Sequence, residues 1–272
     1  MTNPPKKNLL KISITALVER TGHLAIASVL YLIKLSAFIY QTLLPGNSTD
    51  HGKRISRRPV ISQVIFSGID ALPAITIISL AIALSVTAQF ILVLQSVTPE
   101  KEVIQALTQI VALELAPMLT AIILIGRSGS AIAVDLGNMR VHQEIQGLEL
   151  LGINIKQFFV LPRILGMAFS QFTLAVYFSG IVMVGGIIFS AVLHSPSNYK
   201  YLLILIDSIT PYEILLFLIK NLLFGIIIGA TACFHGLRVE QSITEVPQQT
   251  QQAIVNSLVL IFIVDGLLVF AA

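Results

Sequence analysis

Three ionisable side chains lie inside long apolar runs of this sequence. Glu114, Lys220 and Asp265 each interrupt a run that otherwise lacks Asp, Glu, Lys and Arg. A charge within a membrane-spanning helix is costly unless it is paired or hydrated, so these residues are candidates for function. Two acids and one base could form an intramembrane charge network. Such a network either only locks helices together or couples their movement to the gating of a cavity.

The composition indicates the elements that must position these charges. The chain has 272 residues, of which 55% are hydrophobic and 11% are charged. A soluble domain carries about 25% charged residues, so lipid is the main solvent of this chain. A spanning helix needs roughly 20 apolar residues, and five segments meet that requirement, at about 74–95, 103–126, 164–193, 214–237 and 253–272. The predicted fold class is therefore an all-α membrane protein with five transmembrane helices.

Residues 24–43 form an apolar segment of a different kind. Lys34 lies in its middle, and basic residues flank it on both sides. This pattern predicts an interfacial helix in the plane of the headgroups, and a sixth span is the alternative that the sequence leaves open. The predicted organisation is an N-terminal cytoplasmic or interfacial region at 1–58 and a transmembrane domain at 59–272.

The basic residues are distributed unequally over the predicted loops. With a cytoplasmic N-terminus, all of the 17 Lys and Arg residues except Lys101, Lys200 and Lys220 fall on the inner side. Inner loops of membrane proteins carry an excess of Lys and Arg. The sequence therefore predicts a multi-pass protein with its N-terminus in the cytoplasm and its C-terminus on the outer, periplasmic face.

A polar stretch lies between the second and third predicted spans. Small residues recur in it at helical spacing, at Gly126, Ser130, Ala133 and Gly137. Small side chains on one helix face allow a second helix to approach closely. We expect a helix on the cytoplasmic side, which either packs only against the rest of the chain or is bound by a soluble partner. Gly225 and Gly229 predict another close helix contact.

Short motifs in this stretch and in the later spans make up a family pattern. They are Glu114-Leu115-Ala116-Pro117, Gly126-Arg127, Gly129-Ser130-Ala131, Asp135, Gly137, Met139, Leu148, Gly152, Pro162-Arg163, Ile219-Lys220, Phe224-Gly225, His235-Gly236-Leu237-Arg238 and Val264-Asp265. The pattern resembles that of the MlaE/YrbE family of ABC-transporter permeases, over roughly residues 60–272. The chain departs from that pattern at Val134-Asp135, where the family has Ala-Glu, and at Gln143-Glu144, where the family order is reversed.

The resemblance implies a permease subunit that acts as a homodimer. It makes the segment around 128–151 a coupling helix that docks on an ABC ATPase of the MlaF type. The residues expected to serve this coupling are Arg127, Asp135, Met139, Arg140, Gln143, Glu144 and Leu148. The chain lacks a G-x-x-x-x-G-K-[ST] loop, so ATP and Mg²⁺ are expected on that separate ATPase. No cofactor or metal site is expected in this chain.

The implied function is the movement of phospholipids between the bacterial inner membrane and a periplasmic MCE-domain protein of the MlaD type. This activity would maintain lipid asymmetry of the outer membrane in a Gram-negative envelope. A STAS-domain subunit of the MlaB type is a further family expectation, and no nucleic-acid partner is expected. The sequence fixes neither the direction of transport nor the headgroup preference.

Five residues could border a cavity for lipid chains, namely Gln89, Phe90, Val93, Leu258 and Phe262. Helix packing or lipid contact is the more usual explanation of such an apolar stripe. No catalytic residue is expected, because the sequence contains neither H-E-x-x-H nor G-x-S-x-G. Two other functions stay open, an intramembrane enzyme and a membrane scaffold that anchors an MCE protein without active transport.

Overall fold

The structure is a computed structural model, and it describes residues 26, 29–44, 57–94, 108–194, 210–240 and 242–271. The regular elements of this part of the chain are helices. Five of them are long and apolar enough to cross a membrane, at Pro59–Val86, Thr108–Val141, Lys156–Gly185, Pro211–Gly236 and Glu245–Phe270. The predicted all-α fold with five transmembrane helices is confirmed.

The chain divides into two compact units, Met1–Ser48 and Thr49–Ala272. The described part of the first unit is mainly the apolar helix Val29–Leu43. Many of its apolar side chains are exposed. Whether this segment lies in the membrane surface or spans it stays a prediction. The five long helices belong to the second unit.

The first long helix begins earlier than the sequence suggested. It consists of α2 (Arg57–Gly68), a 3-10 turn η1 (Ile69–Ala71) and α3 (Leu72–Leu94). Its apolar span starts at Pro59, so the predicted start near residue 74 was wrong. Asp70 lies within this span. The helix continues through both Asp70 and Pro73.

The second long helix runs without a break from Thr108 to Val141. It has four segments, which are η2 (Thr108–Leu115), α5 (Ala116–Leu124), η3 (Ile125–Gly129) and α6 (Ser130–Val141). Both η segments are π-helical. The first half of the polar stretch therefore continues this helix instead of forming a separate element. A short separate helix, α7 (Glu144–Leu150), follows Gln143, whose φ of 61° turns the chain.

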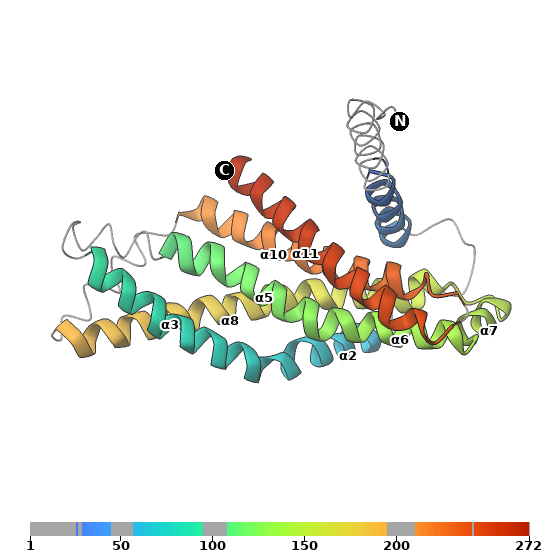
Figure 1. Ribbon diagram of the computed structural model, residues 1–272, viewed down its shortest axis with the longest axis horizontal. Helices are drawn as coiled ribbons and strands as arrows, with labels where there is room; N and C mark the ends of the chain where they lie inside the picture. Colours follow the sequence, from blue (N-terminus) through green and yellow to red (C-terminus); the bar gives the residue numbers. More distant parts are fainter. Residues whose placement is uncertain are drawn as a thin grey trace, which may run out of the picture. The chain divides into compact units, whose positions relative to one another are not determined.

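Helix α8 (Leu161–His194), which continues from the π-helical η4 (Lys156–Val160), lies at the centre of the second unit. It packs against α2, α3, α5 and α10 (Pro211–Gly236) (Figure 1). A Cβ atom on Gly225 would collide with the backbone of Ala168, and one on Gly229 would lie 2.9 Å from the Cα atom of Ile164. The backbones of α8 and α10 are therefore in direct contact, as the two glycines predict.

Helix α11 (Glu245–Ala271) runs back along α10 (Figure 1). Polar contacts join the two helices. The hydroxyl groups of Thr231 and Ser257 form a hydrogen bond. The ring of the buried His235 lies between two α11 side chains, with Nδ1 3.0 Å from Gln249 Oε1 and Nε2 3.0 Å from Asn256 Nδ2. These contacts fix α11 against α10 near the end of α10.

Candidate functional site, a charged cluster between three spans

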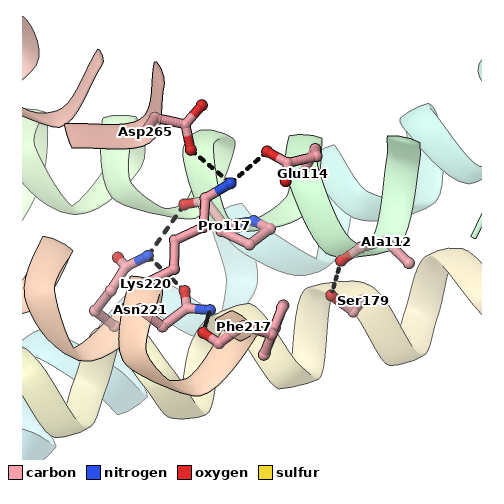
Figure 2. A network of polar contacts seen from close by, with 9 residues as sticks. Ala112, Glu114, Pro117, Ser179, Phe217, Lys220, Asn221 and Asp265 are labelled. Atoms are coloured by element: carbon pink, nitrogen blue, oxygen red, sulfur yellow. Dashed lines mark hydrogen bonds and ion pairs between the residues drawn. The ribbon is translucent and has the colours of Figure 1, made fainter. Parts of the chain in front are cut away.

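The structure brings Glu114, Lys220 and Asp265 together (Figure 2). The ammonium group of Lys220, on α10, lies between two carboxylates. It contacts Oε2 of Glu114, on the second long helix, and it is 2.5 Å from Oδ1 of Asp265, on α11. The cluster therefore connects three spans through one cationic side chain.

Burial differs within this cluster. The Lys220 side chain is 5% exposed and that of Asp265 is 13% exposed, whereas Glu114 is 43% exposed. An unpaired ammonium in such a position is strongly unfavourable, and the two carboxylates compensate for its burial. The ionised cluster has one negative charge in excess. Glu114 is the member with the most access to its surroundings, so it is the carboxylate most able to exchange partners.

A layer of amide hydrogen bonds adjoins the cluster. Nε2 of Gln171, a fully buried residue of α8, donates to the carbonyl oxygen of Pro117 at 3.0 Å and to Oδ1 of Asn221 at 3.2 Å. Nδ2 of Asn221 donates to the carbonyl oxygen of Phe217 at 2.8 Å (Figure 2). Asn221 directly follows Lys220, and Pro117 lies three residues after Glu114. The amides thus link the segments that carry the ion pair.

A hydroxyl group compensates for the proline in the second helix. Pro117 has no N–H for a carbonyl of the preceding turn. The carbonyl oxygen of Ala112, five residues before Pro117, accepts a hydrogen bond of 2.6 Å from the Ser179 hydroxyl on α8 (Figure 2). This contact satisfies a buried backbone oxygen where the helix widens into the π-helical η2.

Two further ion pairs lie along the second helix. Nη2 of Arg127 is 3.5 Å from Oδ2 of Asp70, and Nη2 of Arg163 is 2.5 Å from Oδ2 of Asp135. Asp70 is 51% exposed and Asp135 is 60% exposed. Within this chain Arg127 and Asp135 join the second helix to the first span and to Arg163 at the start of α8. Their expected contact with an ATPase stays a prediction.

The other residues of the predicted coupling segment lie at the end of this helix and on α7. Met139, Arg140 and Leu148 are partly buried, and Gln143 and Glu144 are exposed. Within α7 the side chain of Ile145 is buried. The turn after α7 presents Leu150, which is 90% exposed, and Leu151, which is 77% exposed. Sequence reasoning missed these two leucines, because nothing in the pattern separates them from buried leucines.

The described structure does not test the residues proposed for a lipid cavity. Side chains of Gln89, Phe90 and Val93 lie outside the described residues, while Leu258 is partly buried and Phe262 is half exposed. A pocket of about 480 Å³ lies elsewhere, between α6 and the first turns of α11. Its lining is mainly apolar and consists of Val134, Asn138, Ile243, Val246, Pro247, Thr250, Gln251 and Ile254. The lipid cavity stays a prediction.

Comparison of the sequence with known proteins identifies the family of this chain. The sequence profile of the MlaE permease family matches residues 60–271. A probable ABC transporter permease protein of Synechocystis is 31% identical over 77% of this chain and 80% of its own length. The chloroplastic protein TRIGALACTOSYLDIACYLGLYCEROL 1 of Arabidopsis thaliana is 28% identical over 79% of this chain and 61% of its own. The intermembrane phospholipid transport system permease protein MlaE of Haemophilus influenzae is 23% identical over 77% of this chain and 80% of its own length.

The five apolar helices and these relatives define a multi-pass membrane permease of the ABC-transporter class. The chain belongs to the MlaE permease family, which confirms the resemblance seen in the sequence. A permease of this class is not itself catalytic, and ATP hydrolysis belongs to a separate ATPase subunit.

Proposed function

We propose that this chain is the permease subunit of an ABC transporter that moves phospholipids between the inner membrane and a periplasmic MCE-domain protein. In this proposal two copies form the membrane core, the N-terminus is cytoplasmic and the C-terminus is periplasmic. The Haemophilus relative is named for intermembrane phospholipid transport, which supports the substrate class. The activity would maintain lipid asymmetry of the outer membrane, and a STAS-domain subunit is an additional expected partner.

The observation that carries the proposal is the buried contact of Lys220 with carboxylates from two other spans. A scaffold gains little from a charge in this position, because apolar packing can hold helices at no desolvation cost. A transporter can use it, since movement of any one of the three helices changes an ion pair. The exposed member, Glu114, can exchange Lys220 for water or a lipid headgroup as the helices separate.

The second helix supplies a path by which an ATPase can act on this cluster. It runs without a break from Glu114 to Val141, and α7 follows after two residues. Leu150 and Leu151 present apolar surface at the end of α7, and an apolar socket on the ATPase could hold them. Displacement of α7 would then move the helix that carries Glu114.

Purification of the tagged chain from its own membranes in mild detergent tests the composition of this transporter. We expect mass spectrometry to find a Walker-motif ATPase, an MCE-domain protein and phospholipid in stoichiometric amounts. Recovery of the chain alone would contradict the proposal.

Reconstitution into proteoliposomes then separates transport from anchoring. Movement of a fluorescent phosphatidylethanolamine between the vesicle and the MCE protein should depend on ATP. It should stop when the ATPase carries an inactive Walker motif. Lipid movement that is unchanged with the inactive ATPase would favour the scaffold function.

A further inference from the structure

We propose that Gln171 is a positioning residue that holds the second helix against α10 and thereby sets the contact between Glu114 and Lys220. The expected effect on lipid transport rests on the proposed function. The hydrogen-bond geometry of Gln171 does not depend on which substrate is transported. Gln171 touches neither charged group. It acts through its two hydrogen-bond acceptors, which belong to the two helices that carry the ion pair.

The orientation of the Gln171 amide is determined by its partners. Both partners, the Pro117 carbonyl and Asn221 Oδ1, are oxygen atoms that can only accept. Asn221 cannot reverse its own amide without cost, because its Nδ2 donates to the Phe217 carbonyl. A reversed Gln171 amide would place Oε1 against two oxygens. The amide therefore has one favourable orientation, and in it both Nε2 hydrogens are used.

The two acceptors are close in sequence to the two charges. Pro117 lies three residues after Glu114, which is about one helical turn, and Asn221 adjoins Lys220. One fully buried side chain of α8 therefore bridges the acid-bearing segment and the base-bearing segment. A helix movement that separates Glu114 from Lys220 must also break one of the two Gln171 bonds.

The structure indicates which bond breaks. The backbones of α8 and α10 touch at Gly225 and Gly229, so the bond between Gln171 and Asn221 joins two helices that can hardly separate. The bond to Pro117 crosses to a helix with π-helical turns on both sides of α5. When that bond breaks, a donor is left unpaired in a buried place, which opposes the opening of the cluster. Oε1 of Gln171 has no partner among the described residues, so no second contact retains the amide.

A double-mutant cycle on the complete transporter tests the inference. Gln171→Met keeps the length of the side chain and removes both donors. Lys220→Met removes the ammonium group, and the double variant completes the cycle. The matched control is Ser179→Ala, which removes another buried hydrogen bond between α8 and a carbonyl of the second helix. The readout is ATP-dependent movement of fluorescent phosphatidylethanolamine in proteoliposomes, together with the amount of assembled complex.

We expect Gln171→Met to lower transport about tenfold without loss of assembled complex, which corresponds to one buried hydrogen bond. In the Lys220→Met background the same change should have less than about a twofold effect on the remaining rate, because the contact that Gln171 positions is already absent. Ser179→Ala should change the rate by a similar factor in both backgrounds. Equal factors for Gln171→Met in both backgrounds would overturn the inference.

A distance measurement tests the positioning role of Gln171 even if the complex transports no lipid. Spin labels at the exposed positions Ile122 on α5 and Ile219 on α10 report the separation of the two helices, with Cys233→Ala removing the native thiol. Gln171→Met should broaden or lengthen the distance distribution, and Ser179→Ala should leave it nearly unchanged. Unchanged distances in Gln171→Met would refute the positioning role. Absence of transport by the unmodified complex, with the distance change present, would instead refute the proposed function alone.

Discussion

The second helix carries ion pairs in two different surroundings. At one end Glu114 contacts Lys220, a side chain that is 5% exposed and shared with Asp265. Further along, Arg127 pairs with Asp70, and Asp135 with Arg163, and in both pairs the acid is more than half exposed, although Arg163 itself is 14% exposed. All of these pairs join a basic side chain to a carboxylate, but the free-energy cost of breaking a pair differs between the two surroundings.

The difference lies in desolvation. An exposed pair exchanges its contact for water with little change in free energy, typically about 0–1 kcal/mol. A buried pair that loses one partner leaves the other charge without compensation, which costs about 3–5 kcal/mol. The two regions therefore suit different tasks. The buried cluster can resist or report helix movement, whereas the exposed pairs mainly guide how helices align.

Loss of Lys220 should have the largest effect. Lys220→Ala leaves two carboxylates without a cation, and we expect ATP-dependent lipid transport to fall at least about a hundredfold, to a low remaining rate, while the complex still assembles. Because Glu114 can turn toward its surroundings, the stability cost should be near the lower end of the buried range, about 3 kcal/mol. Transport in proteoliposomes and the amount of protein in the membrane are the two measurements. Complete loss of the protein from the membrane would support a purely structural lock.

Removal of all three charges should separate stability from transport. The triple variant Glu114→Gln, Lys220→Met and Asp265→Asn contains no uncompensated charge, so its melting temperature in detergent should return most of the way to that of the natural chain. Transport should stay about as low as in Lys220→Ala, because helix movement no longer exchanges ion pairs. A triple variant that transports at the natural rate would show that the charges serve stability alone.

A change at the tip of α7 should have an intermediate effect on assembly. Leu150→Asp places a charge where the side chain is 90% exposed, so the melting temperature of the isolated chain should not change. If an apolar socket on the ATPase holds this tip, the Kd for the ATPase should rise at least about tenfold. Glu149→Gln, at the neighbouring exposed position, is the control. Equal affinity for Leu150→Asp and the natural chain would exclude this contact.

The exposed pairs should show the smallest effect. Asp135→Asn keeps the shape of a side chain that is 60% exposed and removes only its charge. Because Arg163 is only 14% exposed, we expect a loss of stability of about 1–2 kcal/mol, between that of an exposed and that of a buried pair, and a smaller one at high salt, because exposed charges are screened. Thermal melting at low and high ionic strength measures it. A loss as large as that of Lys220→Ala would contradict the distinction between the two regions.

The sequence predicted the elements whose signal is local. Apolar runs identified five spans, and isolated charges identified Glu114, Lys220 and Asp265, because hydropathy and charge are properties of single segments. It did not predict the start of the first span, since Asp70 looks like a loop residue until its partner Arg127 is known. Small residues were only partly informative. Ala133 and Gly137 do lie against neighbouring helices, but Gly126 faces open space.

The buried amide network was not predictable for a related reason. Gln171 stands alone in a predominantly apolar run, and its importance comes from the opposing Pro117 and Asn221 rather than from its neighbours in sequence. Nothing local distinguishes it from a glutamine that faces another helix without a partner. The same holds for Leu150 and Leu151, whose exposure depends on where α7 ends.

The glycine contacts between α8 and α10 assign roles to the three charges. At Gly225 and Gly229 the backbones of α8 and α10 touch with no side chain between them, so we expect these two helices to move together. Lys220 belongs to this pair of helices, whereas Glu114 and Asp265 belong to helices outside it. We therefore expect the Lys220 ammonium group to keep its position relative to α8 and α10 during transport. The carboxylates of Glu114 and Asp265 would then move relative to it, each with its own helix.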